Sequence, residues 1–353
     1  MRQIRFAQLG DKARIEKAHV GALVGTIDSR LATLAKDPSL CPPNSLEASY
    51  LAEIMKHPAH DLLIMGVQEM RDLVRRVDVL LPTGAFYRKT KKASAIQKSF
   101  TALNKELLKI FSYTNFSHEA PWCLGSLAQE LVKTVKYCPY CNAETVYAYK
   151  IKMSHGQRGN ATSLKLVKSA FDHYFPKARY PFLAISLYNL IPACTRCNSG
   201  FKGDDASDLL KMAHPYAELT GCRPSEDMHE EMKFDVVFSN SHCLSHCTEN
   251  DLSGILLHER QSGNFPMGVQ WDRTFHLTES YTALYKADAA LAIWRALAYS
   301  KRYLDGMMKQ VRYAGLPQCD IERFLYGARL NEDDINCQRF GKMIIDLVET
   351  YRK

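Results

Sequence analysis

Apolar residues recur at helical spacing through the first third of the chain. Between residues 11 and 36 they return every three or four positions, which predicts an amphipathic helix. A proline-containing loop follows at 37–44, and Ser45 is a good N-cap for the next helix. The same periodicity predicts two further helices, over residues 59–81 and 93–111, the first of them stopped by Pro82-Thr83-Gly84.

The last third of the chain has a mixed pattern. Residues 232–240 favour a strand, residues 279–313 carry a long helical repeat, and residues 332–351 predict a final helix. Within the long repeat, one apolar stripe is expected to be helical core. This stripe consists of Leu284, Leu291, Trp294 and Leu297.

Residues 138–203 differ in character from both flanks. The run from Val146 to Ile151, with Tyr147 and Tyr149, favours a strand, and Cys194-x-x-Cys197 opens a short helix. The chain is therefore expected to be α+β and mostly α. We divide it into a helical region at 1–115, a core at 116–215 and a mixed, mostly helical region at 216–353.

Charge is unevenly distributed along the chain, whose formal net charge is +8. Residues 138–203 hold 9 Lys and Arg against 2 Asp and Glu, residues 1–137 hold 20 against 13, and residues 204–353 hold 17 against 23. A basic block of this kind suits a polyanion such as nucleic acid. A merely solvated basic face explains the charge of this block equally well.

The eleven cysteines point to metal rather than to disulfides. The N-terminus has no apolar segment of a signal peptide, and no stretch is apolar enough to span a membrane, so we expect a cytoplasmic protein. An odd number of cysteines in such a protein argues against a disulfide framework. Two Cys-x-x-Cys pairs, Cys138/Cys141 and Cys194/Cys197, instead predict a structural zinc with four thiolate ligands and no open position.

An Asp172-His173 dipeptide lies between the two cysteine pairs. The dipeptide alone does not indicate a function, but the residues around it do. A carboxylate beside an imidazole can hold a divalent cation and activate water. The dipeptide is followed by Pro176, by the run Tyr188 to Cys194, by Cys197-Asn198 and by Lys202. This pattern resembles the HNH endonucleases, or ββα-metal nucleases. In particular it is similar to HNH proteins of bacterial anti-phage defence, such as those of Septu systems and of some retrons.

The resemblance implies a role for each residue that matches the motif. Asp172 is expected to be a metal ligand and His173 the general base that deprotonates the attacking water. Asn189 would orient the loop that bears His173. Asn198 would be the second ligand, and Lys202 would contact a phosphate. The fold implied is a ββα-metal core stapled by the four-cysteine zinc and flanked by helical regions.

Asn198 stands where many members of the family have histidine. Its amide oxygen is a hard ligand, which favours Mg²⁺ or Mn²⁺ over softer ions. RNA-guided CRISPR effectors also have Asn at this place in their HNH domains, so we interpret the residue as a variant and expect an active nuclease. DNA is the expected substrate, although the sequence does not separate DNA from RNA. The alternative is a non-catalytic, zinc-stapled nucleic-acid-binding or scaffold module.

Other candidates carry weaker signals. His155 and Arg158 lie in a polar loop from which they could reach the scissile phosphate. The resemblance further implies an ABC-type ATPase as a partner. A second cluster offers metal-ligand types without a Cys-x-x-Cys pair, and we expect partly buried side chains there rather than a metal. It consists of His242, Cys243, His246 and Cys247.

Overall fold

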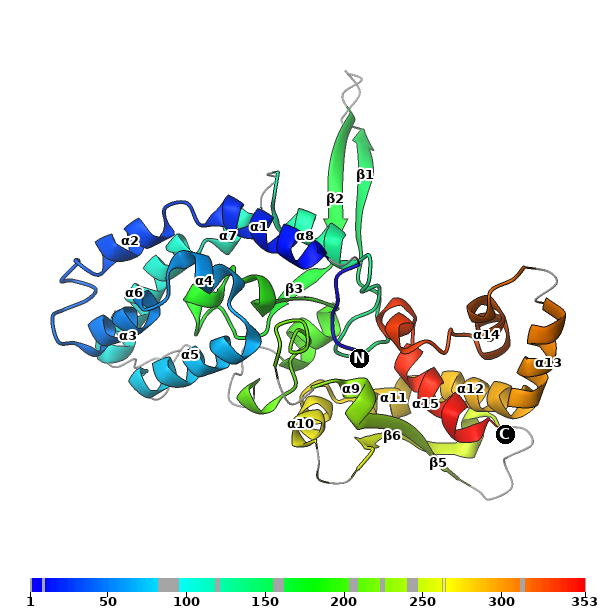
Figure 1. The fold of residues 1–353 in the computed structure, drawn as a ribbon. Coiled ribbons are helices and arrows are strands. Elements are labelled where there is room, and N and C mark those ends of the chain that lie inside the picture. Colours follow the sequence, from blue (N-terminus) through cyan, green and yellow to red (C-terminus); the bar gives the residue numbers. More distant parts are fainter. Residues whose placement is uncertain are drawn as a thin grey trace.

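The protein is α+β and mostly helical, as expected. The computed structural model describes residues 2–7, 10–81, 95–117, 121–154, 162–202, 209–222, 226–239, 247–261, 263, 265–311 and 315–352. In this part of the chain, the strands form three separate two-stranded antiparallel sheets, β1–β2, β3–β4 and β5–β6. Helices pack around β3–β4 and β5–β6, whereas β1–β2 projects away from them (Figure 1). In the described residues, no helix is long and apolar enough to cross a membrane.

In the described residues, six helices form the N-terminal end of the molecule. The helix predicted over 11–36 breaks in two at Val24–Thr26, and the helix predicted over 59–81 breaks at Gly66, whose backbone is extended. Ser45 caps its helix as predicted, because its side chain accepts a hydrogen bond from the backbone N–H of Ala48. The helices are α1 (Asp11–Leu23), α2 (Ile27–Leu34), α3 (Leu46–Met55), α4 (Ala59–Ile64), α5 (Val67–Leu80) and α6 (Ala95–Ile110).

The central part of the chain contains two of the three sheets. Strand β1 begins at Ala148, two residues later than the predicted apolar run. Helix η3, a wide π-type helix, begins inside the second cysteine pair and contains Cys197, where a short helix was expected. The elements are α7 (Tyr113–Ser117), α8 (Leu124–Leu131), β1 (Ala148–Ser154), β2 (Thr162–Lys168), β3 (Ala170–His173), β4 (Leu190–Ala193) and η3 (Arg196–Lys202).

The C-terminal part has more breaks than its periodicity predicts. The helix expected over 279–313 is three helices, interrupted near Tyr285 and Tyr299. The final helix begins only at Gly341, because Phe340 adopts a left-handed backbone conformation with φ +56°. The elements are α9 (Met228–Glu231), β5 (Met232–Phe238), β6 (Leu252–Glu259), α10 (Pro266–Phe275), α11 (Leu277–Leu284), α12 (Lys286–Ala298), α13 (Lys301–Val311), α14 (Gln318–Tyr326) and α15 (Gly341–Tyr351).

The apolar stripe expected to be helical core is mostly exposed, so that prediction was wrong. Leu284 is 60% exposed, Leu291 45% and Trp294 40%. The physical reason lies within α12, whose buried face is offset around the helix axis from the face that carries Leu291 and Trp294. Helix α12 instead buries Ala289, Ile293 and Ala296.

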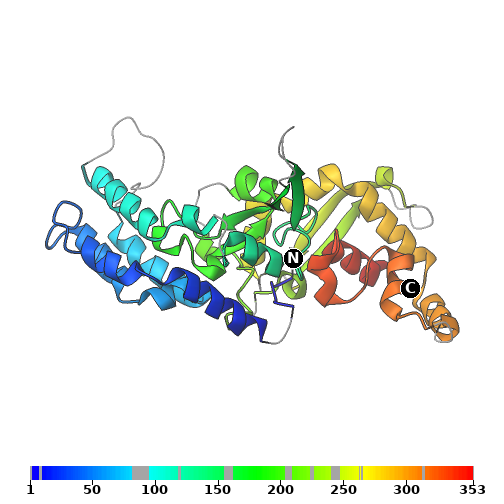
Figure 2. The same ribbon diagram turned by 90° about the horizontal axis from the view of Figure 1, so that it is seen from above.

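One buried core runs through the N-terminal helices, the central sheets and the C-terminal elements. The described N-terminal segment, residues 2–7, crosses the middle of the molecule (Figure 1). Its Ile4 N–H donates to the Pro215 carbonyl, and its Arg2 N–H donates to Asn336 Oδ1 at 3.1 Å. Figure 2 shows the helices of the two ends on opposite sides of this crossing. The three predicted regions therefore share a core.

His19 docks helix α1 onto the segment that precedes β4. Its Nε2 lies 2.7 Å from the Ile185 carbonyl, and the Trp122 indole N–H donates to Nδ1 at 3.3 Å. Burial lowers the pKa of His19 to about 4. The folded protein therefore holds this imidazole neutral, whereas the unfolded chain protonates it near pH 6.5.

We expect acid to destabilise the protein through His19. A depressed histidine pKa contributes stability that is fully present above pH 6.5 and is lost as the pH falls towards 4. Lowering the pH from 7 to 5 should therefore reduce the free energy of unfolding by about 2 kcal/mol through His19 alone. Urea unfolding with zinc present should show that His19→Gln is less stable than wild type at pH 7 and loses less stability on acidification. Equal losses in the two proteins would contradict the assignment.

Candidate metal centre and active site

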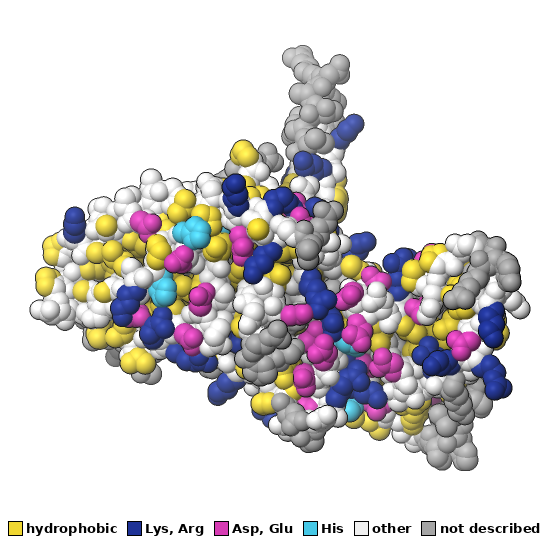
Figure 3. Space-filling view, viewed as in Figure 1, with side chains coloured by type: hydrophobic (Ala, Val, Ile, Leu, Met, Phe, Trp, Pro, Cys, Tyr) yellow, Lys and Arg dark blue, Asp and Glu magenta, His cyan; other side chains and the backbone are white. Residues whose placement is uncertain are grey.

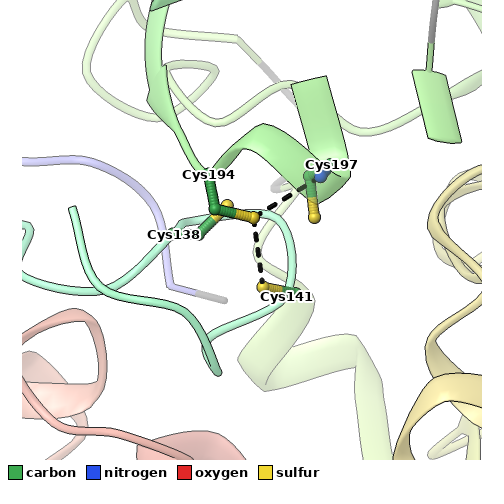
Figure 4. Close-up of side chains that lie close together, drawn as sticks. All are labelled: Cys138, Cys141, Cys194 and Cys197. Atoms are coloured by element: carbon green, nitrogen blue, oxygen red, sulfur yellow. Dashed lines mark hydrogen bonds between the residues drawn. The ribbon is translucent and has the colours of Figure 1, made fainter. Parts of the chain in front are cut away.

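The two Cys-x-x-Cys pairs come together in a buried cluster. The Sγ atoms of Cys138, Cys141, Cys194 and Cys197 all lie within 4.8 Å of one another, and all four residues are buried (Figure 4). Tetrahedral zinc with Zn–S bonds of about 2.3 Å places its sulfurs about 3.8 Å apart. The Cys141 and Cys194 sulfurs, for example, are 4.0 Å apart. The four side chains therefore fit a structural zinc.

Local backbone geometry shapes the first cysteine pair. Asn142 follows the pair with φ +53°, and its N–H donates to the Cys138 carbonyl at 2.7 Å. Asn tolerates this left-handed conformation better than most residues. Hydrogen bonding with the Cys138 thiol lowers the pKa of both Cys141 and Cys194. Burial raises the pKa of Cys138, and hydrogen bonding with Cys138 raises the pKa of Cys197, so two of the four cysteines are shifted towards the thiolate, the form that binds zinc.

The C-terminal helices hold the first cysteine pair in place. The Trp271 indole of α10 donates to the Tyr140 carbonyl at 2.9 Å, and the Tyr281 hydroxyl of α11 donates to the Cys141 carbonyl at 2.7 Å. The side chain of Asn142 donates to the Ile335 carbonyl and accepts from the N–H of Lys342. The cluster thus joins the central sheets to the C-terminal part of the chain.

A strand–strand–helix unit positions the predicted catalytic residues. Asp172 and His173 are the last two residues of β3. This strand pairs antiparallel with β4, and Asp172 lies opposite Ile191. Helix η3 follows β4 and carries Asn198. A cavity of about 380 Å³ lies at the junction. It is lined by Tyr113, Phe171, Asp172, His173, Pro176, Lys177, Asn198 and Ser199. Asp172, His173 and Asn198 are thus brought to one cavity.

His173 is held in one orientation by a backbone carbonyl. Its Nε2 lies 3.0 Å from the Ala184 oxygen, and its ring packs against Tyr113 with centroids 4.6 Å apart. When Nε2–H donates to that carbonyl, Nδ1 keeps its lone pair. Burial, with a smaller effect of Lys177, lowers the pKa of His173 to about 3. At neutral pH the side chain is therefore unprotonated, as a proton acceptor must be, while a pKa this far below neutral makes it a weak base.

One oxygen of Asp172 is already engaged. Its Oδ2 accepts from the Tyr140 hydroxyl at 2.5 Å and from Lys202 Nζ at 2.5 Å. Lys202 also donates to the His173 carbonyl, and only 1% of its side chain is exposed. This differs from the phosphate contact expected of Lys202, since a buried ammonium against Asp172 is not presented to a substrate. Among the described residues, Asp172 Oδ1 accepts no hydrogen bond, which leaves this oxygen for a cation.

Asn189 braces the loop that follows His173. Its Oδ1 accepts from the Phe175 N–H at 2.7 Å, while its Nδ2 donates to the carbonyls of Phe175 and Leu183. The side chain is fully buried. It thus fixes the chain two residues after His173 to the segment just before Ala184, whose carbonyl orients the imidazole. This geometry is consistent with the positioning role that the motif implies.

The sequence analysis assigned no role to several residues that the structure places in this site. Tyr140 lies inside the first cysteine pair, yet its hydroxyl reaches Asp172. Lys177 lines the cavity, with Nζ 4.3 Å from the centroid of the Tyr113 ring. Tyr140 lies inside a cysteine pair that the sequence singled out, and Lys177 lies four residues after His173, and this closeness in sequence was the available signal. His155, Arg158 and the second cluster except Cys247 lie outside the described residues; Cys247 is buried.

The buried pair between Lys202 and Asp172 leads to a prediction about stability. Removing one partner of such a pair costs about 3–5 kcal/mol, because the other charge stays buried alone. Lys202→Met should therefore lower the free energy of unfolding by about that amount. Adding Asp172→Asn should restore part of the loss, since no unpaired charge then remains. Urea unfolding of the two single variants and the double variant measures the coupling. Purely additive losses would show that the two residues do not stabilise each other.

Comparison with known proteins leaves the chain without a match. No protein-family model matches it, and no curated protein or solved structure is significantly similar to it.

Proposed function

We propose that the protein is a metal-dependent endonuclease of the HNH type. The observation that carries this proposal is the cavity shared by Asp172, His173 and Asn198. These residues lie on a β3–β4–η3 unit, the order of elements in a ββα-metal core, directly beside the four-cysteine cluster. Phosphodiester hydrolysis needs a base for the water and a cation for the developing charge, and this set of residues can supply both.

Each side chain of the cavity then has a defined task. His173 accepts the proton of the attacking water at Nδ1, while the Ala184 carbonyl holds Nε2–H in place. Asp172 Oδ1 and the Asn198 amide oxygen would hold Mg²⁺ or Mn²⁺, which would polarise the phosphate and stabilise the leaving oxygen. Lys177, rather than Lys202, is placed to contact a phosphate, because it lines the cavity.

One observation favours a second candidate, a non-catalytic zinc-stapled binding module. Lys202 neutralises Asp172 in the structure, as it would if the carboxylate were purely structural. The pair does not exclude catalysis, since Oδ1 remains for a cation. A binding module also gives no reason for a neutral His173 oriented beside an Asn and an Asp in one cavity. The partner ATPase and the role in anti-phage defence stay predictions that rest on the resemblance alone.

A plasmid-nicking assay tests the proposal. Supercoiled DNA should be nicked when Mg²⁺ or Mn²⁺ is added and should stay intact without added divalent cation. If the protein has a partner, the assay must include it. DNA binding without any cleavage, with the candidate partner present, would favour the binding module instead.

A further inference from the structure

The β1–β2 hairpin stands away from the body of the molecule as an arm, which we define by the described residues 148–154 and 162–168 (Figure 1). The strands pair in continuous register from Ala148–Lys168 to Ser154–Thr162. Helix α8 packs against the base of the arm. A Cβ on Gly125 of α8 would lie 2.2 Å from Leu166 Cδ2, so the helix backbone approaches the arm closely. The base is thus held firmly while the rest extends outwards.

The arm is basic and carries no acidic residue. Its lysines are Lys150, Lys152, Lys165 and Lys168, and the first three are exposed. Lys168 is half-buried near the Phe171 ring, and burial lowers its pKa. Basic side chains are visible along the arm in Figure 3, in contrast to the acidic side chains that gather lower in that view.

The faces of the arm differ in chemistry. Tyr149 and Ile151 share one face with Lys165, which pairs with Ile151, and Tyr149 is 51% exposed. Lys150 and Lys152 lie on the opposite face, because side chains alternate along a strand. The face of Tyr149 and Ile151 therefore combines an exposed aromatic ring, a partly exposed apolar side chain and an exposed lysine, a combination suited to binding another molecule.

We propose that the arm enters the major groove of double-stranded DNA. This inference rests on the proposed nuclease function and names its substrate. The major groove of B-form DNA is about 12 Å wide and admits a two-stranded ribbon. Seven residues per strand give an arm about 23 Å long, enough to follow the groove. Lysines on both faces lie within reach of the phosphates that wall the groove, while Tyr149 and Ile151 suit base edges and thymine methyl groups.

The connection to the candidate active site supports this placement. β2 ends at Lys168 and β3 begins at Ala170, so Asp172 and His173 follow the arm within five residues. DNA bound by the arm would therefore have its backbone near the cavity that Asp172 and His173 line. The major groove of A-form RNA is too deep and narrow for side chains to read, which favours DNA over duplex RNA.

The test compares two triple variants of the full-length protein. Lys150→Gln/Lys152→Gln/Lys165→Gln removes the exposed lysines of the arm. The matched control, Lys36→Gln/Lys301→Gln/Lys309→Gln, removes three exposed lysines elsewhere with the same change in charge. Both should keep the zinc content and the melting temperature of wild type. Binding to a labelled 30-base-pair DNA duplex is measured by fluorescence anisotropy across a salt series, without added divalent cation.

The arm variant should bind the duplex roughly 10- to 100-fold more weakly, and its salt slope should fall by about 3. The control should bind like wild type, and a triple Lys→Arg variant of the arm should bind the duplex normally. Duplex binding that is unchanged in the arm variant, equally weakened in the control or absent in wild type would overturn the proposal. An equal loss on an RNA duplex would overturn the choice of DNA. Because binding is measured without cleavage, failure of the nuclease proposal would be seen separately, in the nicking assay.

Discussion

Replacing His173 by alanine is expected to lower the rate of DNA cleavage by about 10²–10⁴-fold. The imidazole is the proposed proton acceptor, and it lines the cavity beside Asp172 and Asn198, held through Nε2 by the Ala184 carbonyl. The fold and the zinc content should remain, since the side chain is only partly buried and makes one hydrogen bond. Initial rates of plasmid nicking at several Mg²⁺ and Mn²⁺ concentrations measure the effect.

The response to added metal should distinguish the base from the cation ligands. Asn198→Ala should also strongly lower cleavage, but higher Mg²⁺ or Mn²⁺ should restore part of the activity, because in the proposed mechanism the lost group only binds the cation. His173→Ala should gain nothing from added metal. Asn198 is the cleaner ligand variant, since Asp172→Ala would also leave Lys202 buried without its counter-charge.

A matched control separates the chemistry from a general effect of losing a histidine. His258 lies on β6 with 47% of its side chain exposed, outside the cavity lining. His258→Ala should therefore nick DNA like wild type. Cleavage by His173→Ala at the wild-type rate would show that the assigned site is wrong, and the binding module would then be the better interpretation.

The sequence predicted where most of the helices lie but not where they break. The apolar repeat in the sequence indicates an amphipathic face. This repeat can continue across a break of two or three residues between two helices, so it does not show the break. Gly66, extended between α4 and α5, and Phe340, left-handed before α15, are interruptions of this kind. Strands β3 and β4 have four residues each, and β4 is buried throughout, so alternation could not reveal them.

The candidate site was predictable to the extent that its chemistry is local in sequence. The spacing of the cysteine pairs predicted their cluster, and the structure confirms a buried four-cysteine group. The state of Asp172 was not predictable. It depends on Tyr140 and Lys202, which are 32 and 30 residues away along the chain. An Asp-His dipeptide carries no information on such partners, so Lys202 was assigned to a phosphate instead.

Loss of the zinc ligands is expected to have the largest effect on the fold. Structural zinc contributes on the order of 10 kcal/mol in small zinc sites, comparable to the whole free energy of unfolding of an ordinary domain. Here the cluster also joins separate parts of the chain, because Trp271 and Tyr281 donate to the carbonyls of Tyr140 and Cys141. Cys138→Ser should therefore yield protein that is insoluble or unfolded.

The neighbourhood of the cluster gives the reason why we expect that serine cannot replace Cys138. Cys138 is fully buried, and its replacement leaves three thiols and a hydroxyl that binds zinc poorly. The first cysteine pair would then lose its shape, and with it the position of Tyr140 against Asp172. Cys319→Ser, at a partly exposed cysteine outside the cluster, should fold normally and retain one zinc per chain. Zinc analysis and circular dichroism of both variants and of wild type measure the outcome, and a well-folded, zinc-free wild-type protein would refute the zinc site.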